Sequence, residues 1–232
     1  MGMHSGLTAD AWRGKFMSVS ETIVFIIEMI GTVAFASSGA MVGIRKNMDI
    51  FGVEVLGIIT AVGGGIIRDI LIGALPPRTF KDSVYITVAA ITSCLLFILV
   101  YFNKQILASK WMVKYERMMS TLDAIGLGAF TVIGIYVAVS RPDKKSDLLL
   151  VVVGMITGIG GGVLRDMMAG TMPFVFVKHI YACASMVGAI VCIVMMKYVD
   201  KVIAMVVGAM IIIVIRLLAA HYKWNLPRIK ES

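Results

Sequence analysis

The chain has few of the side chains on which soluble enzymes and metal-binding domains depend. Only 16% of its 232 residues are charged, and it contains three histidines, three cysteines and five prolines. Cys94, Cys183 and Cys192 fall within apolar runs without metal-ligand spacing, so we expect buried, inert thiols and no structural metal. No serine elbow, phosphate loop, dinucleotide fingerprint or pair of metal-binding histidines is present. The sequence therefore gives no support to an enzyme and implies no cofactor.

Acidic residues are also scarce relative to basic ones. The chain has 14 Asp and Glu against 22 Lys and Arg, a net charge of +8, while 59% of its residues are hydrophobic. A mean hydropathy of +0.92 is far above that of an ordinary soluble domain. Positive charge in so apolar a chain fits an anionic membrane surface, and gives no reason to invoke a nucleic-acid partner.

Seven apolar runs have about the length needed to cross ~30 Å of hydrocarbon. They begin near residues 22, 52, 84, 121, 148, 179 and 202. The alternating pattern of a membrane strand is absent, so these runs are interpreted as helices. The predicted fold is an all-α membrane protein with seven transmembrane helices.

A twenty-residue block occurs twice, at 57–76 and 154–173. The two copies agree at ten of twenty positions, and both contain three glycines followed two residues later by Arg-Asp. Upstream, Glu28 aligns with Asp123, so each copy begins one span earlier. A third span follows each block, which gives an organisation of three plus three plus one.

Because three spans is an odd number, the second repeat enters the membrane from the opposite side, and the repeats are inverted. The predicted segments are an N-terminal extension (1–20), a first three-helix repeat (21–102), a basic linker (103–120), a second three-helix repeat (121–197), a seventh helix (198–220) and a C-terminal tail (221–232).

The glycines are expected to kink the second and fifth helices near the middle of the membrane. Three glycines in place of alanine cost about 3 kcal/mol of helix propensity, and carbonyls released there could coordinate a cation or a zwitterion. The alternative is that small residues simply let helices pack closely. The predicted pathway glycines are Gly63, Gly64, Gly65, Gly160, Gly161 and Gly162.

Other residues of the repeated block support this interpretation. Thr60 and Thr157 lie one turn before the glycines and could offer hydroxyls to an ion or to their own backbone. Pro76 and Pro173 are predicted to end the broken helices, because proline cannot donate the hydrogen bond that continues a helix.

The charged residues of the block are predicted to pair across the repeats. Arg68 and Asp69 are consecutive and point about 100° apart, as do Arg165 and Asp166, so each needs a partner from elsewhere. The expected pairs join Arg68 to Asp166 or Asp123, and Arg165 to Asp69 or Glu28. Such a network could be static, or it could line an aqueous pathway, which is the interpretation we favour.

A basic segment joins the repeats. Lys104, Lys110, Lys114 and Arg117 alternate with aromatic residues, which suits either a solvated linker with interfacial anchors or a site for anionic lipids. The distribution of basic residues, ten on one face against nine on the other, slightly favours an N-terminus outside the cell and a C-terminus in the cytoplasm.

The doubled Gly-Gly-Gly-x-x-Arg-Asp motif on seven spans resembles the bacterial branch of the trimeric intracellular cation channel family, from about Glu21 to Ala220. The resemblance implies a homotrimer in the bacterial inner membrane, with one pore for potassium or another monovalent cation in each protomer. Its second and fifth helices would line that pore. The same branch also carries a glycine-transporter label, so a carrier of a small zwitterionic amino acid is the alternative.

Overall fold

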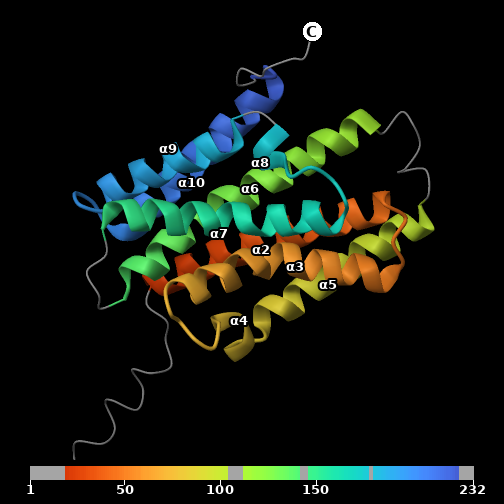
Figure 1. Ribbon diagram of the computed structural model, residues 1–232, viewed down its shortest axis with the longest axis horizontal. Coiled ribbons are helices and arrows are strands. Elements are labelled where there is room, and N and C mark those ends of the chain that lie inside the picture. The colour runs from red at the N-terminus through yellow and green to blue at the C-terminus, as the bar shows by residue number, and fades with distance from the viewer. Residues whose placement is uncertain (1–18, 104–111, 142–145, 178–179, 225–232) are drawn as a thin grey trace, which may run out of the picture.

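A computed structural model describes residues 19–103, 112–141, 146–177 and 180–224, with the side chains of 112–116 left undescribed. Regular structure within these ranges is entirely helical (Figure 1). The helices are α2 (Val19–Arg45), α3 (Ile50–Leu71), α4 (Arg78–Lys81), α5 (Val84–Phe102), α6 (Met112–Val139), α7 (Asp147–Met168), α8 (Phe174–Val177), α9 (Tyr181–Met195) and α10 (Lys201–His221).

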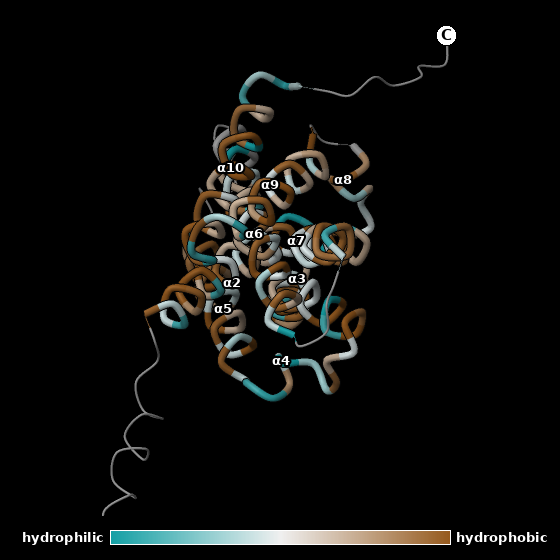
Figure 2. The backbone as a smooth tube through the Cα atoms, turned by 90° about the vertical axis from the view of Figure 1, so that its left-hand side faces the viewer, coloured by the Kyte–Doolittle hydropathy of each residue, from teal (hydrophilic) through white to brown (hydrophobic). Residues whose placement is uncertain are grey.

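Six of the described helices are long and apolar enough to cross a membrane: α2, α3, α5, the 117–139 part of α6, α7 and α10. Helix α9, the expected sixth span, is present but has only 15 residues. At 1.5 Å per residue it is about 22 Å long, which is shorter than the ~30 Å hydrocarbon core. Figure 2, which looks roughly along the helices, shows hydrophobic residues on the labelled membrane-length helices and hydrophilic residues in several of the connections.

The two repeats meet along two helix pairs, α2 with α6 and α3 with α7. Phe35 of α2 and Phe130 of α6 have ring centroids 5.3 Å apart. Each ring lies against a glycine of the opposite helix, Phe35 against Gly126 and Phe130 against Gly31. These reciprocal contacts are those expected of two inverted copies packed around a pseudo-twofold axis.

Helices α3 and α7 lie side by side in the middle of the molecule (Figure 1). Their α-helical hydrogen bonding continues without a break through both triple glycines. The release of backbone carbonyls expected there is therefore wrong, whereas continuous hydrogen bonding does not test the expected kink, which stays a prediction. Instead, a side-chain carbon at Gly64 would collide with the carbonyl oxygen of Thr157, and one at Gly161 with the carbonyl oxygen of Thr60. The absence of these side chains lets the two backbones touch, as the close-packing alternative predicts.

Both central helices end earlier than predicted. Helix α3 ends at Leu71 and α7 at Met168, each five residues before Pro76 or Pro173. Gly73 and Gly170 end them instead, with φ of 68° and 63°. The N–H of Gly73 bonds to the carbonyl of Ile70 at 3.1 Å, and the equivalent bond from Gly170 runs to Met167 at 3.1 Å. This is the Schellman arrangement, for which glycine is preferred, so the helix-breaking role predicted for the prolines is wrong.

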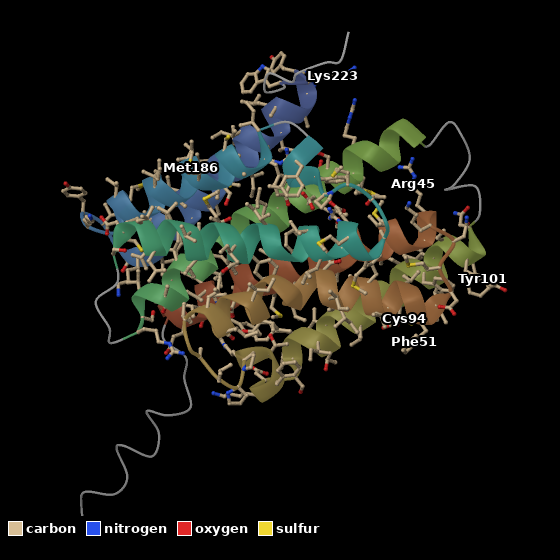
Figure 3. All side chains as sticks on the ribbon, viewed as in Figure 1. Arg45, Phe51, Cys94, Tyr101, Met186 and Lys223 are labelled. Atoms are coloured by element: carbon tan, nitrogen blue, oxygen red, sulfur yellow. The ribbon has the colours of Figure 1, made fainter. Side chains whose placement is uncertain are left out.

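The remaining helices pack around the central part of the molecule. Helix α5 packs on α2 and α3, and α10 packs on α6 and α9. Apolar side chains of α5 such as Ile91, Leu95 and Leu99 are exposed, as suits a surface that faces lipid or another protein. Cys94, on the same helix, is half-buried and lies at the periphery in Figure 3. Cys183 is also half-buried, and of the three cysteines only Cys192 is fully buried as expected.

The connection between the two repeats is shorter in the structure than the linker predicted at 103–120. Helix α6 begins at Met112, nine residues before the expected start of the second repeat at 121. The apolar run begins only near Thr121, whereas the preceding polar turns are helical and continuous with it. Hydropathy marks where a helix enters the membrane and not where its hydrogen bonding begins.

Candidate permeation pathway

The second repeat buries a charged cluster, here termed the second centre: Asp123, Arg165, Asp166, Tyr181 and Arg216. Arg165 is fully buried. Its Nη1 donates to Asp123 Oδ1 at 2.7 Å, and its Nε donates to Asp166 Oδ1 at 2.8 Å. With two carboxylates beside it, the guanidinium charge is neutralised within its own repeat.

A contact with the first repeat completes this centre. Arg165 Nη1 also donates to the hydroxyl of Ser38 on α2 at 2.6 Å. Ser38 itself is fully buried. Of the side-chain bonds that Arg165 makes in the described part of the chain, this one alone reaches the other repeat.

Aromatic rings and a second arginine close the second centre. The guanidinium carbon of Arg165 lies 4.9 Å from the ring centroid of Phe174, and that of Arg216 lies 4.5 Å from the ring centroid of Tyr181. Arg216 stands near the end of an apolar span, a place from which an arginine can reach the membrane interface. It is instead 2% exposed. The seventh helix therefore contributes a buried cation to the second repeat, held by a cation–π contact.

The first repeat holds a related but different cluster, here termed the first centre: Glu28, Arg68, Asp69, Arg78 and Tyr85. Glu28 accepts hydrogen bonds from Arg78 Nη1 at 3.1 Å and from the Tyr85 hydroxyl, one on each carboxylate oxygen. Arg78 also lies over the Tyr85 ring, at 5.5 Å from its centroid. The Arg78 side chain is about half exposed, so this centre reaches the molecular surface.

Arg68 makes only one of the contacts that its counterpart Arg165 makes. Its Nε donates to Asp69 Oδ1 at 2.8 Å. Within the described ranges, its terminal nitrogens Nη1 and Nη2 have no hydrogen-bonding partner. The residue that aligns with Asp123 is Glu28, and both of its oxygens are occupied by Arg78 and Tyr85.

The predicted ion pairs across the repeats are therefore wrong. Arg68 does not pair with Asp166 or Asp123, and Arg165 does not pair with Asp69 or Glu28. Consecutive residues pair instead, because an arginine side chain is long enough to fold back across the 100° that separates neighbours on a helix. The buried ion pairs link elements of one repeat, so they stabilise each repeat internally.

The two aspartates have a second role that the sequence did not indicate. Asp69 Oδ2 accepts from the backbone N–H of Arg78 at 2.8 Å, and Asp166 Oδ2 accepts from that of Phe174 at 2.9 Å. The bond lies one residue later in the first repeat because Pro77, at the position of Phe174, has no N–H. Each carboxylate thus anchors the backbone of the segment that follows its own central helix, α3 or α7.

The threonines before the glycines bond to their own helices. The hydroxyl of Thr60 donates to the carbonyl of Leu56 at 2.6 Å, and that of Thr157 to the carbonyl of Val153 at 2.6 Å. Of the two possibilities that the sequence left open, the local one is observed. Gly39 and Gly134 give these hydroxyls room, since a side-chain carbon at either would lie 2.5 Å from the hydroxyl oxygen.

An apolar cavity of about 330 Å³ opens beside the contact between α3 and α7. Every side chain that lines it is apolar, among them Ile67, Met155 and Leu164. Polar solutes would not be stabilised there.

Of the four basic residues considered for lipid binding, Lys104 and Lys110 lie outside the described residues, as does the side chain of Lys114. Arg117 is exposed on α6. The described ranges contain no group of three or more His, Cys, Asp or Glu that could hold a metal ion.

Apolar helices in two inverted copies, each with a buried Arg-Asp pair beside a triple glycine, define a multi-pass membrane protein built by duplication. A family model described as glycine transporter matches residues 25–101 and 120–197. The UPF0126 inner membrane protein YadS of Escherichia coli is 39% identical over 73% of this chain and 77% of its own length.

Solved structures agree with this assignment. A TRIC cation channel, whose structure is described as a structural basis for conductance through these channels, is 36% identical to this chain. The match covers 90% of this chain and 98% of the channel, with a TM-score of 0.76. The trimeric intracellular cation channel orthologue from Rhodobacter sphaeroides is 27% identical, with 88% and 100% coverage and a TM-score of 0.77. The chain belongs to the TRIC family.

Proposed function

We propose that this protein is a cation channel of the inner membrane, conducting potassium or a similar monovalent cation through each protomer of a homotrimer. The observation that carries the proposal is its 36% identity to a TRIC cation channel over 98% of that channel. A solved orthologue described as trimeric supports the oligomeric state. The inner membrane is supported by the six membrane-length helices and by the name of the Escherichia coli relative.

The pathway would run through the interface of the two repeats. Gly64 and Gly161 mark the closest approach of α3 and α7, so ions would pass there only if the two helices separate. The first and second centres then lie on either side of that constriction. Glu28, Asp69, Asp123 and Asp166 would offset the positive potential that Arg68 and Arg165 present to a cation.

A second function, transport of a small zwitterionic amino acid, is favoured by one specific observation. The family model that matches both repeats is described as glycine transporter. Arginine and carboxylate side chains close together could hold the carboxylate and the amine of such a solute.

Reconstitution in liposomes separates the two functions. Purified protein is tested side by side for potassium flux and for glycine uptake under defined gradients. A channel gives potassium flux that follows voltage without saturating, with no concentrative glycine uptake. Saturable glycine uptake that shows counterflow, without potassium flux, would overturn the channel and establish the carrier.

Further proposals concern assembly and lipids. We propose an N-terminus outside the cell, a C-terminus in the cytoplasm, and contacts of the basic segment around Arg117 with anionic lipids. Mass measurement in mild detergent tests the trimer, and a monomer or dimer there would contradict it.

A further inference from the structure

The two copies of the repeated motif differ in how their arginines are used. Arg165 donates a hydrogen bond from Nε to Asp166, and hydrogen bonds from Nη1 to Asp123 and Ser38. Arg68 donates a hydrogen bond from Nε to Asp69. Among the residues that the structure describes, its side chain donates no other hydrogen bond. A guanidinium has five N–H donors in a planar fork, so four of the Arg68 donors remain available although the residue is only 5% exposed.

The difference follows from Arg78, which the second repeat lacks. Arg78 aligns with Val175, so Asp123 meets no competing arginine from the chain after the central helix. In the first repeat, Arg78 and Tyr85 take both oxygens of Glu28. The carboxylate that would otherwise bind Arg68 is already satisfied.

The space beside the two arginines differs as well. A side-chain carbon at Gly162 would lie 3.2 Å from the Tyr181 hydroxyl, 3.6 Å from Arg165 Nη2 and 3.6 Å from Asp123 Oδ1, so the second centre encloses it. A side-chain carbon at the equivalent Gly65 would meet only Arg68 Nη2, at 3.7 Å. The available donors of Arg68 therefore stand next to open space.

We propose that Arg68 and the space beside Gly65 form a binding site for a small carboxylate, held by two parallel hydrogen bonds from Nη1 and Nη2. Bidentate pairing with a planar oxyanion is the geometry that a guanidinium fork prefers. The second centre does not offer the same pair of donors, because Asp123 and Ser38 already take Arg165 Nη1 and only Nη2 lacks a partner there. Both a simple anion and a zwitterionic amino acid carry such a carboxylate, and the proposal holds for either.

Within the proposed pathway, such a ligand would neutralise the positive charge that Arg68 presents to a permeating cation. This consequence for conduction rests on the proposed function, whereas the binding itself does not. A binding measurement on purified protein therefore tests the site even where potassium flux is absent.

The experiment measures the midpoint of thermal unfolding in detergent against added potassium acetate, glycine or methylammonium chloride, at constant ionic strength set with potassium chloride. A ligand that binds only the folded protein raises the midpoint with concentration. Acetate and glycine are expected to raise it, and methylammonium, which has no carboxylate, is not. A response to acetate alone identifies a simple anion, and a much stronger response to glycine identifies the zwitterion.

Three variants locate the site. Arg68→Gln removes the fork and is expected to weaken the acetate response at least about tenfold, as befits the loss of charge-assisted hydrogen bonds. Gly65→Val fills the space without removing a charge and is expected to weaken it similarly, which keeps the test valid if Arg68→Gln fails to fold. Arg45→Gln, at an exposed arginine on α2, is the matched control and leaves the response unchanged.

The proposal is overturned if neither acetate nor glycine raises the midpoint beyond potassium chloride alone. It is equally overturned if the response survives in both Gly65→Val and a folded Arg68→Gln. If carboxylates bind as expected but liposomes pass no potassium, the site stands and the channel fails.

Discussion

Gly64 of α3 and Gly161 of α7 each face a backbone carbonyl of the opposite helix, that of Thr157 and that of Thr60 respectively. The contact is reciprocal, so the pseudo-twofold axis of the inverted repeats passes close to it. A backbone offers no side chain that can rotate away, which makes these two positions the least tolerant of the six motif glycines.

Gly64→Ala is expected to lower the free energy of unfolding by about 1–3 kcal/mol, because the added methyl group forces α3 and α7 apart. Gly161→Ala should behave alike. Gly65→Ala is the matched control, since its methyl group would meet only the flexible end of Arg68. Unfolding in detergent measures all three, and equal losses in Gly64→Ala and Gly65→Ala would contradict the close-packed contact.

Arg165→Met is expected to cost about 3–5 kcal/mol, because it leaves Asp123 and Asp166 buried without their counter-charge. Arg68→Met should cost less, since Arg68 neutralises only Asp69 in the described structure. Chemical denaturation of both variants measures the difference. Equal destabilisation would contradict this difference, because it would show that Arg68 and Arg165 contribute equally to the free energy of unfolding.

Arg216 and Tyr181 are expected to be energetically coupled. A desolvated cation–π contact is worth about 2 kcal/mol, so the effects of Arg216→Met and Tyr181→Leu on unfolding should not add in the double variant. Tyr181→Phe keeps the ring and should retain most of the coupling. Full additivity would mean that the contact between Arg216 and Tyr181 contributes nothing to stability.

Gly73→Val and Gly170→Val should each destabilise the fold by about 1–2 kcal/mol, because a residue other than glycine is strained at positive φ. No atom lies within 4 Å of a side-chain carbon at either position, so the effect is purely one of backbone conformation. Asparagine tolerates this conformation, and Gly73→Asn and Gly170→Asn are the controls. A loss as large in the asparagine variants would point to another cause.

The helices and the inverted duplication could be predicted from sequence, because the lengths of the apolar runs and the similarity of the two repeats can be read directly from the order of the residues. The pairing of charges could not. Arg78 binds Glu28 across fifty residues from a short helix, α4, that no hydropathy pattern marks. The fold-back of Arg68 onto Asp69 depends on side-chain rotamers, which residue spacing on a helix does not determine.

Other parts of the site left weak signals. Tyr85 and Tyr181 stand at almost equivalent places in the two repeats, and each adjoins the carboxylate of its own centre. Arg216 was visible as an arginine in an apolar helix, but only packing shows whether such a residue reaches the interface or is buried. The helix ends were missed because Gly73 and Gly170 precede the more conspicuous prolines.

The most direct test of the cation channel is the reversal potential of purified protein in a planar bilayer under a potassium chloride gradient. The account predicts a current that reverses near the equilibrium potential of potassium. Reversal near the equilibrium potential of chloride, or no current above that of the bare bilayer, would contradict it.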